Sequence, residues 1–169
     1  MAEARLGRLD QAEAALREAL RVQPLEASAH FNLGLLLAER QRPAEAQSSL
    51  RRALELDPRS ATAAYNLAVL VAPASPKEAA TLTGRAADLA PQDPRYAFTR
   101  AFYLEKAGAA GAAERGLRAL VARHPGYRDG WALLGALLEG RGKAPEAAEV
   151  YRRAAGTVAL SSSDRMVFE

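Results

Sequence analysis

The stretch WALLGALLEGRGKAPEAAEVYRRA, residues 131–154, decides the fold because small and large apolar residues alternate in it at helical spacing. Leu134, Gly135 and Leu138 share one face of a first helix. A glycine-containing turn follows, and a second apolar pattern around Ala147 predicts a second helix. A small residue lets a partner helix approach until a large neighbour fills the space. The stretch therefore predicts two closely packed helices.

The same pattern recurs upstream with a nearly constant period. Four prolines close similar segments at intervals of 34, 33 and 34 residues: Pro24, Pro58, Pro91 and Pro125. A column of small residues in the first helices shares this period: Gly34, Ala68, Ala101 and Gly135. A second column lies in the second helices: Ala12, Ala46, Ala79, Ala113 and Ala147. A repeat of this length indicates a stack of helix pairs.

Trp131, Leu134-Gly135, Ala147 and Tyr151 resemble the signature of the tetratricopeptide repeat (TPR) family, and the stretch from Asn32 to Pro58 is similar to the same pattern. The resemblance covers most of the chain. It implies an all-α fold, a right-handed superhelical solenoid of antiparallel helix pairs, and a role in binding other proteins.

The period also predicts where the helices and repeats lie. We expect helices at residues 8–22, 26–40, 43–56, 60–72, 76–89, 94–107, 110–123, 128–141 and 144–155. We expect a truncated repeat over 1–25, consisting mainly of its second helix, then repeats over 26–59, 60–92 (one residue short), 93–126 and 127–156, and a tail or capping segment over 157–169. Turns are expected at Gly7, Gly108, Gly142 and residues 41–43, with an irregular turn at residues 73–76 because of its two prolines. In the tail, residues 161–164 predict either the cap of a short helix or a disordered end.

Composition narrows the class of protein. A formal charge of +3, from 23 Lys and Arg against 20 Asp and Glu spread along the chain, gives no concentrated basic field, so nucleic acid is not expected as a partner. The absence of cysteine excludes disulfides and thiolate ligands. No stretch approaches a membrane span, so membrane insertion is not expected, and the compartment stays undetermined.

The sequence offers no group of residues that carries chemistry. His30 and His124 lie in different repeats and lack neighbouring ligands, so we expect no metal and no cofactor. We interpret His124 as a helix-end residue with a favourable dipole interaction. The arginine pairs at residues 51–52 and 152–153 are interpreted as a hydrated outer face. Without a nucleophile and base or paired carboxylates, the chain is not expected to be an enzyme.

The family resemblance places certain first-helix residues on a concave wall that binds peptides. In this sequence they are Phe31, Asn32, Leu35, Tyr65, Asn66, Val69, Phe98 and Phe102. The stripe is apolar and aromatic and lacks the lysines that would favour an acidic tail. We therefore predict a groove for a helical or extended apolar peptide, although the same stripe is also typical of a buried core.

Two alternatives remain open at this stage. With only a stub of a first helix before Gly7, the helix at 8–22 would expose one apolar face, and another copy's tail or last repeat would cover it, giving rings or filaments. The candidates for such end-to-end self-association are Leu9, Ala12, Leu16, Ala19, Met166, Val167 and Phe168. Alternatively, the chain is an accessory TPR region of a larger protein or enzyme.

Overall fold

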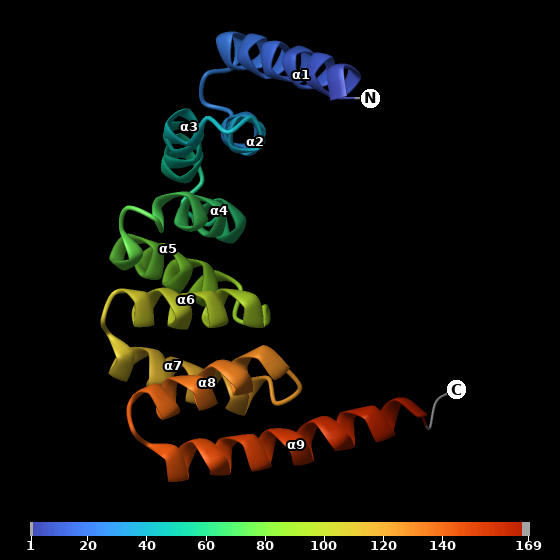
Figure 1. Cartoon of the computed structure of the whole chain (residues 1–169). Helices are drawn as coiled ribbons and strands as arrows, with labels where there is room; N and C mark the ends of the chain where they lie inside the picture. The colour runs from blue at the N-terminus through green and yellow to red at the C-terminus, as the bar shows by residue number, and fades with distance from the viewer. Residues whose placement is uncertain (1, 167–169) are drawn as a thin grey trace. The chain divides into compact units, whose positions relative to one another are not determined.

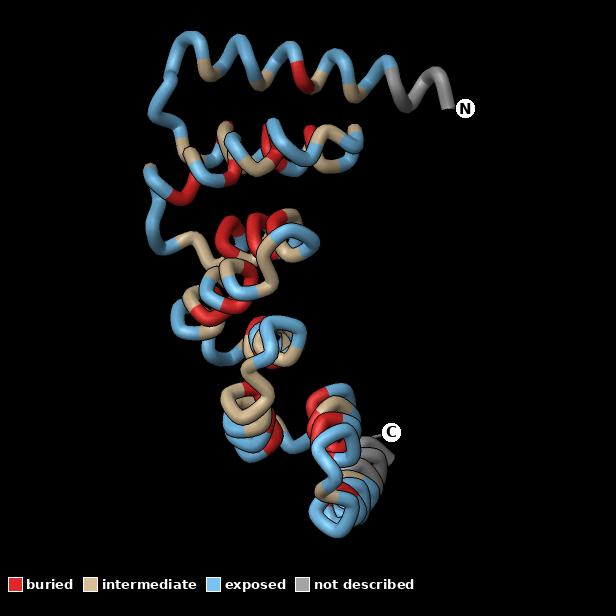
Figure 2. The backbone as a smooth tube through the Cα atoms, turned by 60° about the vertical axis from the view of Figure 1, so that its left-hand side comes forward, coloured by how far each residue is buried: buried red, intermediate tan, exposed pale blue. Residues whose placement is uncertain are grey.

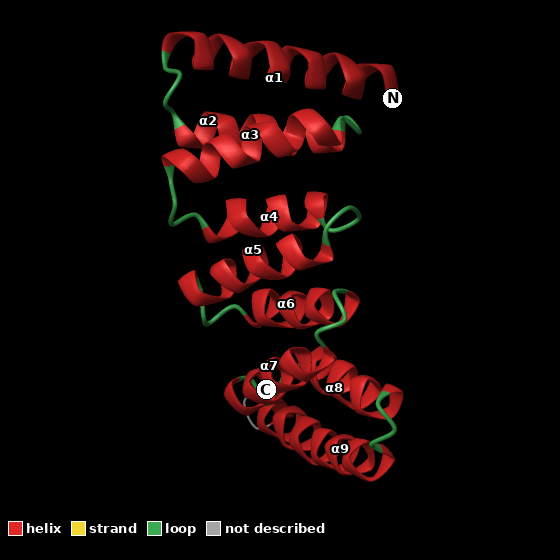
Figure 3. Cartoon of the chain, turned by 90° about the vertical axis from the view of Figure 1, so that its left-hand side faces the viewer, coloured by secondary structure: helices red, strands yellow, loops and turns green. Residues whose placement is uncertain are grey.

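The computed structural model describes the backbone of residues 2–166 and the side chains of residues 7–157. In this part the chain forms nine α-helices and no strand (Figures 1 and 3). They are α1 (Ala2–Val22), α2 (Ala27–Glu39), α3 (Pro43–Leu56), α4 (Ala61–Val71), α5 (Pro76–Leu89), α6 (Pro94–Lys106), α7 (Ala110–Arg123), α8 (Arg128–Gly140) and α9 (Ala144–Met166). The expected all-α class is confirmed, and the internal helices match the expected ranges to within one residue.

The helices belong to two compact units, Met1–Leu89 and Ala90–Glu169. Within the first unit α2 packs against α3 and α4 against α5, and within the second α6 packs against α7 and α8 against α9. Each pair consists of the first and second helix of one predicted repeat. Buried residues recur along the sides of the helices that face their neighbours (Figure 2).

The turns inside three of the four helix pairs, α2–α3, α6–α7 and α8–α9, contain a residue with left-handed backbone. Gly108 and Gly142 have φ angles of 79° and 72°. Gln41 lies at the equivalent position in the turn between α2 and α3. It has a φ angle of 58°, at which a residue with a side chain is strained. The α4–α5 connection, with Pro73 and Pro76, contains no such residue, so the predicted irregular turn is confirmed.

Close packing in the pairs follows the predicted columns of small residues. In α2, a Cβ atom built on Gly34 would lie 2.7 Å from Cγ of Leu50, which is fully buried on α3. Gly135 on α8 faces Tyr151 on α9 in the same way, and Tyr151 is the repeat equivalent of Leu50. Thr83 on α5 occupies the same repeat position as Leu50 and Tyr151, and its buried hydroxyl donates to the carbonyl of Ala79 at 2.8 Å. The small-to-large pairing predicted from the sequence is therefore the packing that the structure shows.

The two ends of the chain differ from the prediction. Residues 2–22 form one continuous helix, so Gly7 lies inside α1 and the expected turn there is wrong. A glycine inside a helix costs only about 1 kcal/mol, so Gly7 by itself does not end α1. At the other end α9 continues through residues 157–166, where we expected a tail or capping segment. The side chain of Met166, and Val167 and Phe168 entirely, lie outside the described residues.

Candidate peptide-binding surface

The first unit presents the predicted stripe on its first helices α2 and α4, which contact each other. Leu35 and Val69 occupy equivalent positions and are 37% and 45% exposed. Phe31 and Tyr65, one turn earlier on the same helices, are half-buried. The structure thus brings these four apolar side chains to neighbouring helices and leaves part of each open to solvent.

The two asparagines of the stripe have different environments. Asn32 is exposed beside Phe31. Asn66 donates through Nδ2 to the carbonyl of Thr62 at 2.8 Å, so its amide is held against its own helix. Asn32 is therefore the better placed of the two to bond a peptide backbone.

The second unit carries its part of the stripe on α6. Phe98 packs edge-on against Tyr127, with ring centroids 5.8 Å apart, while Phe102 is 38% exposed. Nζ of Lys106 lies 5.4 Å from the centroid of the Phe102 ring, within the range of a cation–π interaction. The sequence analysis missed this lysine, although its spacing of four residues from Phe102 was the signal that puts both on one helix face.

The stripe does not extend to α8. The residues of α8 at the positions of Phe98 and Phe102 are Ala132 and Ala136, and both are exposed. The aromatic and branched side chains therefore belong to α2, α4 and α6.

Both histidines bond backbone carbonyls of the repeat-closing prolines. Nε2 of His30 lies 3.0 Å from the oxygen of Pro24, and Nε2 of His124 lies 3.2 Å from the oxygen of Pro91. The expected dipole interaction of His124 is thus replaced by a specific hydrogen bond across 33 residues. In the described part of the chain no three His, Asp or Glu side chains are grouped so that they could hold a metal ion.

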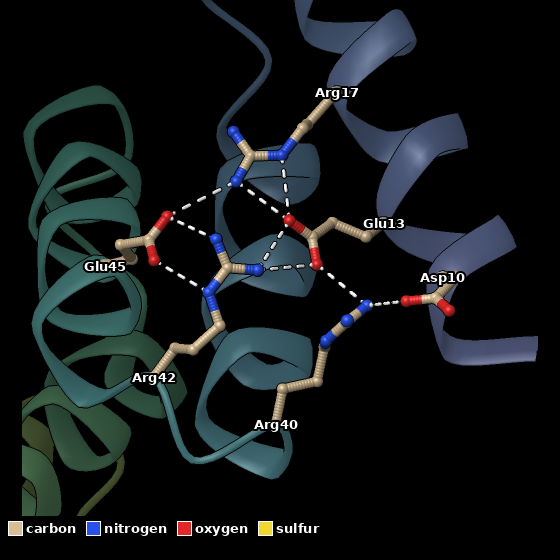
Figure 4. Close-up of polar contacts among 6 residues, drawn as sticks. All are labelled: Asp10, Glu13, Arg17, Arg40, Arg42 and Glu45. Carbon is tan, nitrogen blue, oxygen red and sulfur yellow. Dashed lines mark hydrogen bonds and ion pairs between the residues drawn. The ribbon is translucent and has the colours of Figure 1, made fainter. Parts of the chain in front are cut away.

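A network of charged residues joins α1 to the following helix pair (Figure 4). The Glu13 carboxylate is only 8% exposed and accepts hydrogen bonds from Arg17 at 3.0 Å and from Arg42 at 2.8 and 2.9 Å. Arg40 pairs with the other side of Glu13 at 3.0 Å. Arg42 also donates two hydrogen bonds of 2.7 Å to Glu45.

The second unit repeats this network 101 residues later, a distance of three repeats. There Glu114, with a side chain 12% exposed, accepts from Arg118 at 3.0 Å and pairs with Lys143 at 3.3 Å and with Arg141. Arg118 continues to Glu146 at 2.7 Å. The sequence analysis missed both networks, although the exact three-repeat spacing of their members is visible in the sequence.

Burial and pairing act in opposite directions on the two central carboxylates. Burial alone raises the pKa of Glu13, but the hydrogen bonds and charges of Arg17 and Arg42 outweigh it and lower the pKa below its usual value. At Glu114 burial again raises the pKa, and the stronger effect of Arg118 and Lys143 lowers it. Both carboxylates are therefore charged near neutral pH. This favours a structural role, in which they hold neighbouring helices together through ion pairs, over a role in proton transfer.

The apolar face of α1 is largely covered within its own unit. Leu16 and Leu20 pack against a buried cluster that contains Leu33 and Leu37. Leu9 and Ala12 are half-buried, and Ala19 is exposed. The surface that α1 leaves for a second copy is therefore smaller than the sequence predicts.

The arginine pairs also differ from a purely hydrated face. Arg51 donates to Glu78 of the next second helix at 2.6 Å, and Arg52 to Glu55 at 2.8 Å. Arg152 pairs with Glu149. Of the four guanidinium groups, only that of Arg153 has no hydrogen bond or ion pair with a described residue.

Comparison with known proteins agrees with the repeat geometry. Residues 1–46, 36–94 and 98–164 match the sequence profile described as Tetratricopeptide repeat. The chain therefore belongs to the tetratricopeptide repeat family. No curated protein is significantly similar to it in sequence.

Several solved structures share the fold. A crystal structure of MamA is 21% identical, with a TM-score of 0.80 over 96% of this chain and 95% of that one. YrrB, described as a TPR protein with an unusual peptide-binding site, is 21% identical, with a TM-score of 0.77 over 95% of this chain and 86% of that one. MamA from Desulfovibrio magneticus RS-1 is 18% identical, with a TM-score of 0.76 over 94% and 89% of the two chains.

None of the helices, over the residues that the structure describes, has the length and apolar character required to cross a membrane.

Proposed function

We propose that the chain is a non-catalytic protein-interaction scaffold whose first helices bind an apolar peptide in helical or extended form. The observation that carries this proposal is the pair of exposed side chains Leu35 and Val69, at equivalent positions of the adjacent helices α2 and α4. Large apolar side chains that lie together at a surface are typical of an interaction site. Phe31 and Tyr65 extend the same surface by one helical turn.

Two further observations favour a peptide. Asn32 offers an exposed amide beside the apolar surface, which suits hydrogen bonds to a peptide backbone. The structural relative YrrB is itself described as having a peptide-binding site. Membership of the TPR family supports a scaffold rather than an enzyme.

The test uses an exposed position, so that binding and folding are separated. A random 12-residue peptide library displayed on phage is selected on the protein, and the enriched peptides are synthesised for affinity measurements. We expect Val69→Asp to raise Kd about tenfold or more because it places a charge in the apolar surface. Leu89→Asp is the matched control, since Leu89 is an apolar residue that is 37% exposed and lies outside the stripe. Equal effects of the two substitutions would remove the proposal.

Tyr65→Ala separates a binding role from a core role for the half-buried aromatic residues. We expect weaker peptide binding with the far-ultraviolet circular dichroism of the parent. If helicity is lost instead, Tyr65 belongs to the core and the stripe is narrower than proposed.

Self-association is the second candidate function. Val22 and Leu25, at the end of α1 and in the following connection, are 64% and 68% exposed. Together with Ala19 they form an apolar surface at the end of α1 that a second copy of the chain would contact. Light scattering at several concentrations decides this point, because a monomer throughout the range leaves no role for end-to-end contacts. Either function is also compatible with an accessory region of a larger protein.

A further inference from the structure

The second unit contains a groove between its second helices α7 and α9, with α8 as the floor. Its volume is about 620 Å³. Val121, Trp131, Leu134 and Val150 line it, and all four also belong to the hydrophobic core of the unit. The apolar lining is therefore held in place by core packing before any ligand arrives.

The first unit has a groove at the equivalent place, between α3 and α5, which serves as an internal comparison. Its volume is about 420 Å³. Leu54 and Leu67 of this groove correspond to Val121 and Leu134, 67 residues later. The position of Ala122 is taken by Glu55, which is paired with Arg52. The first-unit groove is thus smaller and carries its own carboxylate.

An arginine on the rim has different partners in the two grooves. In the first unit, Arg85 donates to the backbone carbonyl of Pro58. Its repeat equivalent in the second unit is Arg153, but there the carbonyl of Pro125 accepts the indole N–H of Trp131 at 2.8 Å. The guanidinium of Arg153 makes no hydrogen bond or ion pair with any residue that the structure describes.

Arg153 is also the uncompensated charge of the second-unit groove. The other arginine of the lining, Arg118, is paired with Glu114 at 3.0 Å and Glu146 at 2.7 Å. None of the described residues that line the groove is acidic. An apolar trough with one free guanidinium at its rim complements a ligand that combines an apolar group with a carboxylate.

We propose that this groove is a second binding site, which takes a peptide segment of a partner protein carrying a large apolar side chain and, two residues away, an Asp or Glu. The lining runs from Arg118 on α7 to Pro125 just beyond the end of this helix, about 10 Å at the rise of a helix, which is the span of three extended residues. In an extended peptide, side chains two residues apart point to the same side. The apolar side chain then contacts Trp131 and Val150 while the carboxylate pairs with Arg153.

The test selects a random heptapeptide library displayed on phage against the full chain carrying Val69→Asp, so that the first-helix surface of the first unit is impaired. Enriched peptides are synthesised and titrated while the fluorescence of Trp131, the one tryptophan of the chain, is recorded. We expect enrichment of apolar and acidic residues at a spacing of two, and a change in Trp131 emission on binding.

Two variants decide whether this groove is the site. Arg153→Gln removes the free charge, and Ala122→Glu introduces the carboxylate found in the first-unit groove. Each is expected to raise Kd about tenfold or more. Arg123→Gln, at an exposed residue of α7 outside the lining, is the matched control and should leave Kd unchanged.

The outcomes separate this site from the one proposed above. Peptides that bind equally well to Arg153→Gln and Ala122→Glu, or that lack acidic residues, overturn the second site. The same holds if no peptide is enriched. None of these results affects the first-helix site, which is tested by the response of its own peptides to Val69→Asp.

Discussion

Replacement of Gly34 by alanine should destabilise the protein, although alanine is the better helix former. The new Cβ atom would lie 2.7 and 3.0 Å from Cγ and Cδ2 of Leu50 and 3.3 Å from the carbonyl oxygen of Ala46. Carbon atoms in favourable contact are about 3.5–4.0 Å apart. Leu50 is 0% exposed, so its side chain has no space into which it can move. The two helices of the pair must then separate.

The magnitude follows from two opposing effects. Alanine gains about 1 kcal/mol over glycine inside a helix. An extra methyl group in a well-packed core costs about 1–3 kcal/mol. We expect a net loss of about 1 kcal/mol, and of about 2 kcal/mol at most, in the free energy of unfolding. For a chain of this length each kcal/mol lowers Tm by about 2–4 °C.

Gly135→Ala is the internal comparison, because Gly135 occupies the same column of the repeat. A Cβ atom there would overlap the ring of Tyr151. Tyr151, however, is 39% exposed, and its hydroxyl makes a single long hydrogen bond of 3.3 Å to Glu139. The ring can turn toward solvent at small cost, so the helix-forming gain of alanine is retained. We expect the free energy of unfolding to change by less than about 1 kcal/mol.

The assay is urea unfolding followed by far-ultraviolet circular dichroism, for both single variants and for Gly34→Ala combined with Leu50→Ala. In the double variant, the alanine side chain at position 34 enters the space that Leu50 vacates. The loss in free energy of unfolding should therefore be smaller than the sum of the losses in the two single variants. Equal stabilisation by Gly34→Ala and Gly135→Ala would refute the close approach of α2 and α3. If the effects of Gly34→Ala and Leu50→Ala are strictly additive, the steric conflict at position 34 does not involve Leu50.

Two further predictions concern the turns and the charge networks. Gln41→Gly should raise the free energy of unfolding by about 0.5–1 kcal/mol, because it relieves the left-handed strain at a φ of 58°, whereas Gly108→Ala, measured in the same urea assay, should lower it. Glu13→Gln should lower stability at pH 7. Because the native pKa of Glu13 lies below its usual value of about 4.3, the stability it contributes is present above that value and is lost as the pH falls through the native pKa. The difference in Tm between parent and variant should therefore shrink as the pH is lowered below the usual value. A difference that stays constant throughout acid titration would contradict the charged role of Glu13.

The internal helices were predictable because the repeat constrains each of them twice, by its own apolar face and by its copies. Leu37, Leu67 and Leu138 have the burial that the columns require. Gly7 resembles the turn residues Gly108 and Gly142 in sequence, yet α1 continues through it, because glycine permits a turn without requiring one.

The candidate sites were predictable only in part, because the repeat specifies backbone positions but not side-chain partners. The exposure of Leu35 and Val69 followed from family resemblance, and the structure places both at the surface. The lysine beside Phe102 and the partners of Glu13 depend on rotamers and on contacts between different repeats, which a single apolar pattern does not encode.

The proline carbonyls show how side-chain partners differ between repeats that share one backbone geometry. Each of the four accepts a hydrogen bond from a side chain: His30 for Pro24, Arg85 for Pro58, His124 for Pro91 and Trp131 for Pro125. The acceptor is constant because the chain must turn at the same place in every repeat, whereas the donor changes with the local sequence. At Pro58 the donor is Arg85 on the rim of the first-unit groove, whereas at Pro125 it is Trp131 from the following helix. The guanidinium of Arg153, the repeat equivalent of Arg85, has no partner among the described residues. The second binding site that we propose rests on this difference in one donor residue.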